Sequence, residues 1–263
     1  MVSPEFRILP HETDLDNLFR KYHGDPRNHG WRVRMRRWFG YFSPDQWYHG
    51  VVDRLVNNGC RWIDVGGGKS VFPGATALAR DIASRCGALV GVDPSDNLEQ
   101  NELVHERVKS SIEDFRTDRT FDLATLRMVA EHIERPEQAI QSLARLIRPG
   151  GRVVIYTPNR WSLASVAARG IPDKWHRRFA SLMWNAGADD VFPTFYRMNT
   201  RRTLRAVFEA GGFKEVAFAF LDDCNILSRF RATCFVELCA WRVLRMFGVK
   251  HPENNLLGVY EKV

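Results

Sequence analysis

Between residues 61 and 156, apolar strand-like runs alternate with segments whose apolar residues recur every three to four positions. The first pattern predicts strands and the second predicts helices. The predicted strands are residues 61–65, 88–93, 106–111, 120–128 and 150–157. The predicted helices are residues 74–86 and 136–147. Alternation of strands and helices is typical of βαβ units, so this region predicts an α/β fold with a parallel sheet.

The rest of the pattern adds one helix, two strands and three segments outside the alternation. Residues 200–213 predict an amphipathic helix with Thr200 as its N-cap, and residues 214–221 and 255–263 predict two more strands. We interpret residues 1–58 as an N-terminal helical lid and residues 59–263 as the main domain. Within that domain we expect a cap inserted at residues 159–199 and a helical excursion at residues 222–255.

The composition is that of a globular protein: 263 residues, of which 44% are hydrophobic. The first residues, MVSPEFRILPHETD, lack the patterns of a secretory or transit peptide, so we expect a cytoplasmic location. The five cysteines are odd in number and include no CxxC pair, which argues against a disulfide framework and against a metal site.

The net charge of +7 suits an anionic acceptor, nucleic acid or an anionic membrane surface, and does not choose among them. Residues 225–247 come closest to a membrane-spanning stretch, but five charged residues interrupt them. We expect a helix there that packs mainly on its own domain, with weak peripheral membrane contact as the alternative.

The stretch CRWIDVGGGKSVFPG, residues 60–74, places an acid before a glycine-rich loop that leads into a helix. Such a loop lets backbone N–H groups approach a ligand closely. A dinucleotide fingerprint would need a third glycine where Val71 stands. The pattern acid-x-Gly-x-Gly fits Asp64, Gly66 and Gly68, and here the chain resembles the class I S-adenosylmethionine-dependent methyltransferases of the small-molecule type.

The resemblance continues through residue 159, in the blocks FDLATLRMVAEHIERP and LARLIRPGGRVVIYTPN. It implies a Rossmann-like, doubly wound sheet of seven strands, mostly parallel, with the last strand antiparallel. It also implies S-adenosylmethionine as cofactor, with the ribose on Asp93, the adenine face on Pro94 and the adenine edge beside Ser111, Ile112 and Glu113. The full set of cofactor-binding residues that it implies is Asp64, Gly66, Gly67, Gly68, Asp93, Pro94, Ser111, Ile112, Glu113 and Arg127.

Methyl transfer from a sulfonium is an in-line displacement, so the protein mainly aligns the acceptor and excludes water. His132 is our candidate general base, because the loop after the fourth strand borders the methyl group and imidazole titrates near neutrality. The alternative is that His132 only caps the following turn. For the acceptor we expect Trp161, His176, Tyr196 and Arg197, although the aromatic residues of the cap could instead form its own small core.

We therefore expect a methyltransferase that acts on O or N of a small-molecule, glycan or lipid-intermediate acceptor, anionic if the arginines bind it. One alternative is an RNA methyltransferase, which the basic charge favours. The absence of an appended RNA-binding module and of an Asn-Pro-Pro-Tyr block argues against nucleic acid. The other alternative is a non-catalytic membrane-surface protein with a degenerate nucleotide fold, suggested by Arg231, Arg242 and Arg245 on one face of the 225–247 segment.

Overall fold

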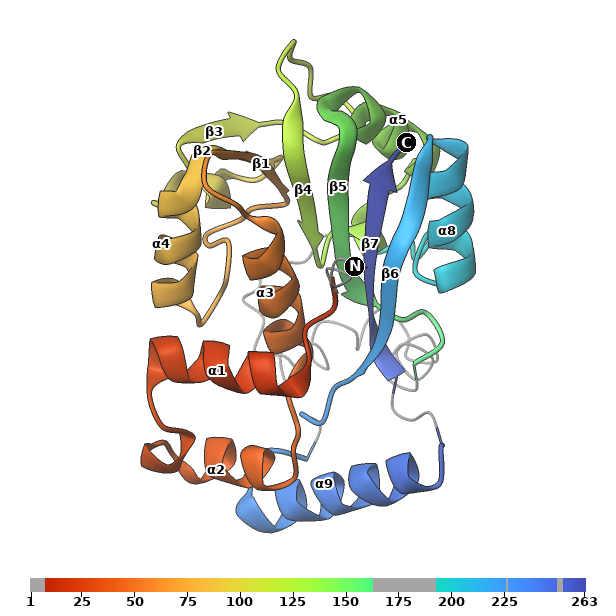
Figure 1. Ribbon diagram of the computed structural model, residues 1–263. Helices are drawn as coiled ribbons and strands as arrows, with labels where there is room; N and C mark the ends of the chain where they lie inside the picture. The colour runs from red at the N-terminus through yellow and green to blue at the C-terminus, as the bar shows by residue number, and fades with distance from the viewer. Residues whose placement is uncertain (1–7, 163–192, 226, 250–252) are drawn as a thin grey trace, which may run out of the picture.

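The computed structural model describes residues 8–162, 193–225, 227–249 and 253–263. Its centre is a seven-stranded sheet in the order β3-β2-β1-β4-β5-β7-β6 (Figure 1). Strand β7 runs antiparallel to both of its neighbours, and the pairs from β3 to β5 are parallel. The strands are β1 Cys60–Val65, β2 Cys86–Asp93, β3 Glu106–Lys109, β4 Phe121–Arg127, β5 Ile147–Pro158, β6 Phe213–Asp222 and β7 Glu253–Lys262. The predicted fold class and the antiparallel last strand are confirmed.

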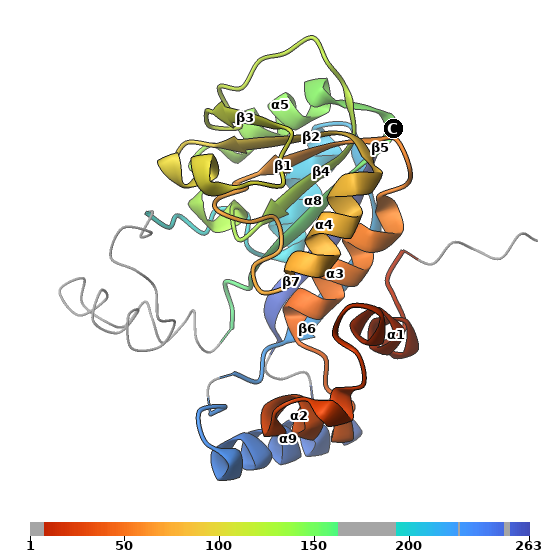
Figure 2. The same cartoon turned by 90° about the vertical axis from the view of Figure 1, so that its left-hand side faces the viewer.

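Helices cover both faces of the sheet, as in a doubly wound fold (Figure 2). One face packs against α3 (Pro44–Leu55) and α4 (Thr76–Arg85), and the other against α5 (Pro136–Leu146) and α8 (Arg201–Ala210). Because side chains alternate along a strand, Trp62 of β1 joins the first core and Ile63 joins the second. Central strands are thus buried on both sides, which explains their nearly continuous apolar sequences.

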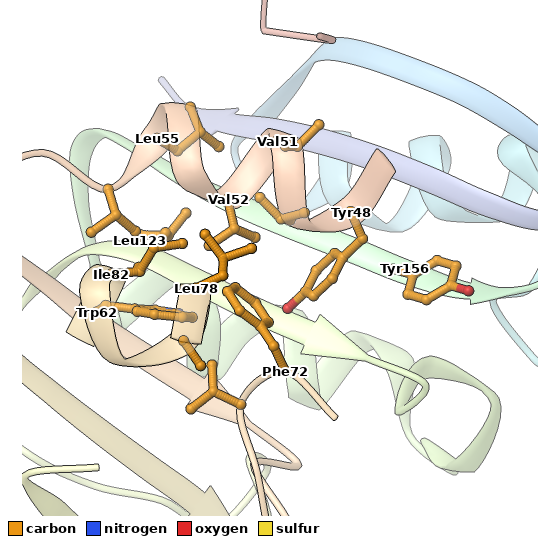
Figure 3. Close-up of a cluster of buried hydrophobic side chains, with 14 of the residues drawn as sticks. Tyr48, Val51, Val52, Leu55, Trp62, Phe72, Leu78, Ile82, Leu123 and Tyr156 are labelled. Atoms are coloured by element: carbon orange, nitrogen blue, oxygen red, sulfur yellow. The ribbon is translucent and has the colours of Figure 1, made fainter. Parts of the chain in front are cut away.

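Helix α3 belongs to the core of the sheet, although it lies within the predicted N-terminal lid. Its residues Tyr48, Val51, Val52 and Leu55 pack with Trp62 and Phe72 (Figure 3). The boundary at residue 58 remains a prediction, and this packing favours counting α3 with the main domain. Proline at the first position of α3 and the Ser43 capping box explain why the helix begins at Pro44.

Helices α2 (Trp31–Trp38) and α9 (Arg231–Met246) form a layer beyond one end of the sheet (Figures 1 and 2). Helix α1 (Glu12–His23) packs on the core beside α3. Helix α9 buries Cys234, Leu238 and Trp241 beside α2. Short 3₁₀ helices complete the described elements: η1 Pro26–Asn28, η2 Asp96–Gln100 and η3 Ala130–His132. None of the described helices combines the length and apolar composition needed to cross a bilayer.

Two predicted boundaries in this region need correction. The helix expected from residue 225 begins at Arg231, because the carbonyls of Leu227 and Ser228 accept side-chain hydrogen bonds from Thr233 and Arg32 instead of helical ones. The excursion expected at residues 222–255 is shorter at both ends, since Asp222 pairs with Glu253 at the end of the β6–β7 ladder. Of the predicted cap, residues 159–162 and 193–199 are described.

Candidate functional site

The glycine loop follows β1 and is held against its neighbours by backbone contacts. Gly66 and Gly68 have φ angles of +70° and +42°, in the region that favours glycine. A Cβ atom on Gly66 would lie 2.2 Å from Cγ2 of Val129, which follows β4. The Gly66 N–H donates to the Val92 carbonyl at 2.7 Å, and the Asn101 amide donates to the Gly67 carbonyl at 3.1 Å. The loop is thus a fixed cradle with no side chains of its own where these glycines lie.

Asp93 ends β2 and joins that strand to the glycine loop. Its buried carboxylate accepts hydrogen bonds from the Gly68 N–H at 3.0 Å, the Ser95 N–H at 2.8 Å and the Ser95 hydroxyl at 2.6 Å. A carboxylate offers about four lone-pair positions, so with three hydrogen bonds in place Asp93 has about one position left for a donor from a ligand. Pro94, the predicted adenine contact, is exposed immediately after it.

Asp64 lies in β1, one strand away from Asp93, and is also buried. Its Oδ1 accepts the Thr125 hydroxyl at 2.6 Å, and Thr125 in turn accepts Nε1 of Trp62 at 2.8 Å. Burial raises the pKa of Asp64 to about 7, against the opposing effect of this hydrogen bond. A cation placed beside Asp64 would favour its ionised form.

Tyr48 of α3 supplies a polar atom that the described residues leave unsatisfied. Its hydroxyl is buried and makes no hydrogen bond of good geometry within the described part of the chain, although the Thr125 hydroxyl is near enough to lower the pKa of Tyr48. Burial raises the pKa of Tyr48, and the charge of Asp64 raises it further, which places the two groups in the same neighbourhood. Buried hydroxyls normally have partners. A polar ligand at the ends of β1 and β4 would supply one, so the residues present fit a cofactor there.

Arg127 ends β4 and connects it to α3. Its Nη2 donates to Oδ1 of Asp45 at 2.8 Å, and its guanidinium lies 5.9 Å from the Tyr156 ring centre. The next residue, Met128, has a φ of +53° and donates its N–H to the Tyr156 carbonyl at 2.7 Å. Non-glycine residues in this conformation cluster at functional sites. The guanidinium of Arg127 is thus engaged by Asp45, and its contact with the cofactor remains a prediction.

Glu131 fastens the loop after β4 to β5 and to the end of the cap. Its buried carboxyl accepts the Thr157 hydroxyl at 2.8 Å, and Thr157 accepts the Asn199 amide at 2.7 Å. Burial raises the pKa of Glu131. Its carbonyl accepts the N–H groups of Phe195 at 2.7 Å and Tyr196 at 3.2 Å.

His132, the predicted base, lies in η3 and is half-buried. Its Nδ1 is 2.9 Å from the Pro193 carbonyl, which can only accept a hydrogen bond. Nδ1 therefore carries the proton of the neutral ring, and the lone pair is on Nε2. This geometry suits a base whose orientation is set by the cap.

The predicted acceptor residues divide into those near His132 and those elsewhere. Tyr196 has a φ of +51° and its N–H reaches the carbonyl of Glu131, while Arg197 donates to the Glu134 carbonyl at 2.7 Å. Both therefore meet the loop that carries His132. Trp161 follows β5 and is largely exposed. His176 lies outside the described residues.

The predicted adenine segment offers less side-chain chemistry than expected. The Ser111 hydroxyl donates to Asp114 at 2.8 Å, and the Ile112 side chain is buried in the core on the α5 side. The Glu113 carbonyl accepts from Arg116 at 2.8 Å. Ile112 can therefore meet a ligand only through its backbone. Within the described ranges, no group of three His, Cys, Asp or Glu side chains is arranged to hold a metal ion.

Sequence reasoning did not identify four residues that shape the site: Asp45, Tyr48, Asn101 and Thr125. Thr125 had a usable signal, because a hydroxyl in an otherwise apolar central strand must find a buried partner. The other three act from segments that only the folded chain brings to the ends of β1, β2 and β4.

The family model described as "Methyltransferase domain" matches residues 26–217, well over half of the chain. The chain belongs to this methyltransferase family. The class predicted from the sequence, the S-adenosylmethionine-dependent methyltransferases, is confirmed, and with it the cofactor.

Curated relatives of this methyltransferase are named ubiquinone biosynthesis O-methyltransferase. The protein from Xanthomonas oryzae pv. oryzae (strain PXO99A) is 33% identical over 155 residues, which cover 51% of this chain and 63% of the relative. The protein from Xanthomonas campestris pv. campestris (strain B100) is 31% identical over 181 residues, which cover 61% of this chain and 69% of the relative. The chain thus spans 63% of the length of the first relative, less than two thirds, and 69% of the second.

Solved structures support the fold alone, because their sequence identities are low. An S-adenosylmethionine-dependent methyltransferase from Mesorhizobium loti aligns with a TM-score of 0.54 at 18% identity, covering 84% of this chain and 98% of that one. The [4+2]-cyclase SpnF aligns with a TM-score of 0.51 at 14% identity, covering 97% of both chains. The same fold thus occurs in a protein named for a different reaction, so the activity has to be argued from the site.

Proposed function

We propose that this chain transfers the methyl group of S-adenosylmethionine to an oxygen, or else a nitrogen, of a small-molecule, glycan or lipid-intermediate acceptor. The name of the relatives, O-methyltransferase, favours oxygen. The observation that carries the proposal is the pair of buried carboxyls, Asp64 and Asp93, at neighbouring strands beside a glycine loop without side chains.

Each part of this arrangement has a role in binding. Gly66, Gly67 and Gly68 give the methionine portion room to approach the backbone. Asp64 would pair with its ammonium group, which would favour the ionised carboxylate. Asp93 would accept a ribose hydroxyl at its remaining lone-pair position, and it is already oriented by the Gly68 N–H and Ser95. The cofactor supplies an activated methyl group on a sulfonium.

An acceptor hydroxyl or amine has to lose a proton when it is methylated. His132 takes it through Nε2, while the Pro193 carbonyl holds Nδ1 in the protonated form. With the cofactor bound, the acceptor would gain the methyl group that the sulfur releases and S-adenosylhomocysteine would leave. The acceptor proton on His132 would balance the lost sulfonium charge. A positioned base typically contributes about 10²–10⁴-fold to the rate.

The acceptor is proposed to lie between the loop after β4 and the cap, beside Tyr196, Arg197 and Trp161. Ligands of open α/β sheets bind beyond the carboxyl ends of the strands, where both segments leave the sheet. Two left-handed non-glycine residues, Met128 and Tyr196, flank the same place. For an anionic acceptor, the Arg197 guanidinium is a suitable partner. His176, outside the described residues, remains part of this proposal.

Transfer of label from methyl-tritiated S-adenosylmethionine tests the function. The purified chain is incubated with a cell extract, which is then separated into water-soluble small molecules, lipids, protein and RNA. We expect label in the small-molecule or lipid fraction. His132→Ala should lower the rate of labelling at least about 10²-fold. The affinity for S-adenosylhomocysteine should not change in that variant. Label confined to RNA or protein would contradict the proposed acceptor class, and undiminished transfer by His132→Ala would reject the base.

A further inference from the structure

Helix α9 has apolar residues on the side that faces away from the protein. Cys234, Leu238 and Trp241 are buried beside α2. Val236, Val243 and Phe247, spaced seven and four residues apart, fall on the opposite side of the helix. Their exposed fractions are 60%, 50% and 79%, and that of neighbouring Met246 is 77%. A surface helix usually places polar residues on this side.

The apolar surface continues onto α2 through an aromatic cluster. Trp38 at the end of α2 is 70% exposed, and its ring stacks on that of Phe235 with centres 6.1 Å apart and planes at 18°. Phe39 meets Phe235 edge-on at 5.6 Å. We name the α2–α9 face by the exposed side chains Trp38, Phe235, Val236, Val243, Met246 and Phe247. Exposed apolar side chains gathered in this way are typical of an interaction site.

Helices α2 and α9 are rich in arginine, although Arg36 and Arg37 of α2 turn inward to Asn225 and Asp16. Helix α2 has four arginines and no acidic residue, and α9 has three arginines and one glutamate. Arg231 and Arg242, eleven residues apart, share one flank of α9. Within the described part of the chain, neither forms an ion pair with an acidic side chain. A helix with one apolar face and arginines along its flank is typical of helices that lie in a membrane interface.

The position of the α2–α9 face permits this contact. Figures 1 and 2 place α2 and α9 side by side as an outer layer at one end of the molecule, away from the chain's C-terminus. A flat bilayer could therefore meet the face without touching the sheet. Symmetric pairing of two copies through this face would instead place the arginines of both copies in one interface, and like charges there repel.

We propose that the α2–α9 face docks on the anionic surface of a lipid bilayer. Val236, Val243 and Phe247 enter the interfacial region, and Trp38 lies at the level of the lipid head groups. Arg231 and Arg242 pair with lipid phosphates. The residues of the α2–α9 face are different from those proposed to bind the cofactor. Loss of membrane docking and loss of cofactor binding can therefore be told apart.

Vesicle flotation with the whole chain tests the proposal. Vesicles made of equal parts phosphatidylglycerol and phosphatidylcholine should carry the protein upward, and added salt should reduce the bound fraction. Vesicles of phosphatidylcholine alone should carry much less. Equal binding to both kinds of vesicle, or no binding to the anionic ones, would overturn the proposal.

Substitutions locate the surface. The double variant V243D/F247D should reduce affinity for the anionic vesicles at least tenfold, and R231E/R242E should do the same. V263D is the matched control, because Val263 is an exposed apolar residue at the end of the chain beyond β7. It should float like the wild type, and all variants should retain binding of S-adenosylhomocysteine. Wild-type flotation by V243D/F247D would overturn the proposal. So would a dimer in analytical ultracentrifugation that this variant dissociates, because the face would then bind a second copy.

Discussion

Large apolar side chains are buried on the α3–α4 side of the sheet but exposed on the α2–α9 face. Tyr48, Trp62 and Phe72 come from three different segments and are completely buried together (Figure 3). Phe247 and Trp38 are comparable in size but remain largely exposed. The amphipathic pattern of a helix thus predicts that the helix forms. Whether its apolar side is covered depends on which other segments reach it.

Charged groups differ between the same regions. At the ends of β1 and β2, Asp64 and Asp93 are buried and each accepts hydrogen bonds from identified donors. On the α2–α9 face, Arg231 and Arg242 are exposed. Buried charges require specific partners, whereas exposed ones act through their sum. The first arrangement suits recognition of one ligand, and the second suits an extended anionic surface.

The largest expected effect contrasts two phenylalanines. Phe72→Ala should lower the free energy of unfolding by about 3–5 kcal/mol, because it leaves a cavity between Tyr48, His49 and Trp62. Phe247→Ala should change it by no more than about 0.5 kcal/mol, since the side chain is exposed. Urea denaturation of both variants measures the difference. Similar decreases in the free energy of unfolding for both variants would show that Phe247 is covered in solution and would contradict the difference between the two regions.

A smaller effect of opposite sign is expected at Asp64. At pH 8, Asp64→Asn replaces a buried carboxylate by a neutral amide that can still accept the Thr125 hydroxyl, and it should raise the free energy of unfolding by about 1–3 kcal/mol. Affinity for S-adenosylhomocysteine should fall in the same variant. The control is Asp118→Asn at an exposed position, which should change neither quantity. A destabilised Asp64→Asn protein would contradict the cost assigned to burying this charge.

The pH dependence follows from the same carboxyl. Its pKa is about 7 in the folded chain and about 3.9 in an unfolded one, so the folded state binds more protons between these values. The stability that protonated Asp64 contributes is therefore complete below about pH 3.9 and is lost as the pH rises through 7. Thermal unfolding of wild type and Asp64→Asn should diverge from pH 4 to pH 7. A constant difference over that range would reject the raised pKa.

Much of the fold was predictable because it depends on local patterns. The alternation of strands and helices located most of the sheet, and the resemblance supplied the direction of β7. The start of α9 was not predictable, because Arg32, nearly two hundred residues away, competes for the Ser228 carbonyl. The packing of α3 against the sheet also depends on contacts distant in sequence.

The site shows the same division. The positions of Asp64, Asp93 and the glycines could be predicted, because the sequence motif places them at the ends of predicted strands. The partners of these groups, such as Thr125 for Asp64 and Asp45 for Arg127, come from other strands and helices. The burial of Ile112 was also invisible to the motif, because the core on the α5 side decides where that side chain points.

The central claim is that the cofactor binds between Asp64 and Asp93, and calorimetric titration with S-adenosylhomocysteine tests it most directly. The wild type should bind one molecule per chain. Asp93→Ala should bind it roughly 10- to 150-fold more weakly, since hydrogen bonds to a charged group contribute about 1.5–3 kcal/mol. Asp96→Ala, which removes an exposed carboxyl three residues later, should bind like the wild type. Absence of binding by the wild type, or equal affinity in Asp93→Ala, would contradict the account.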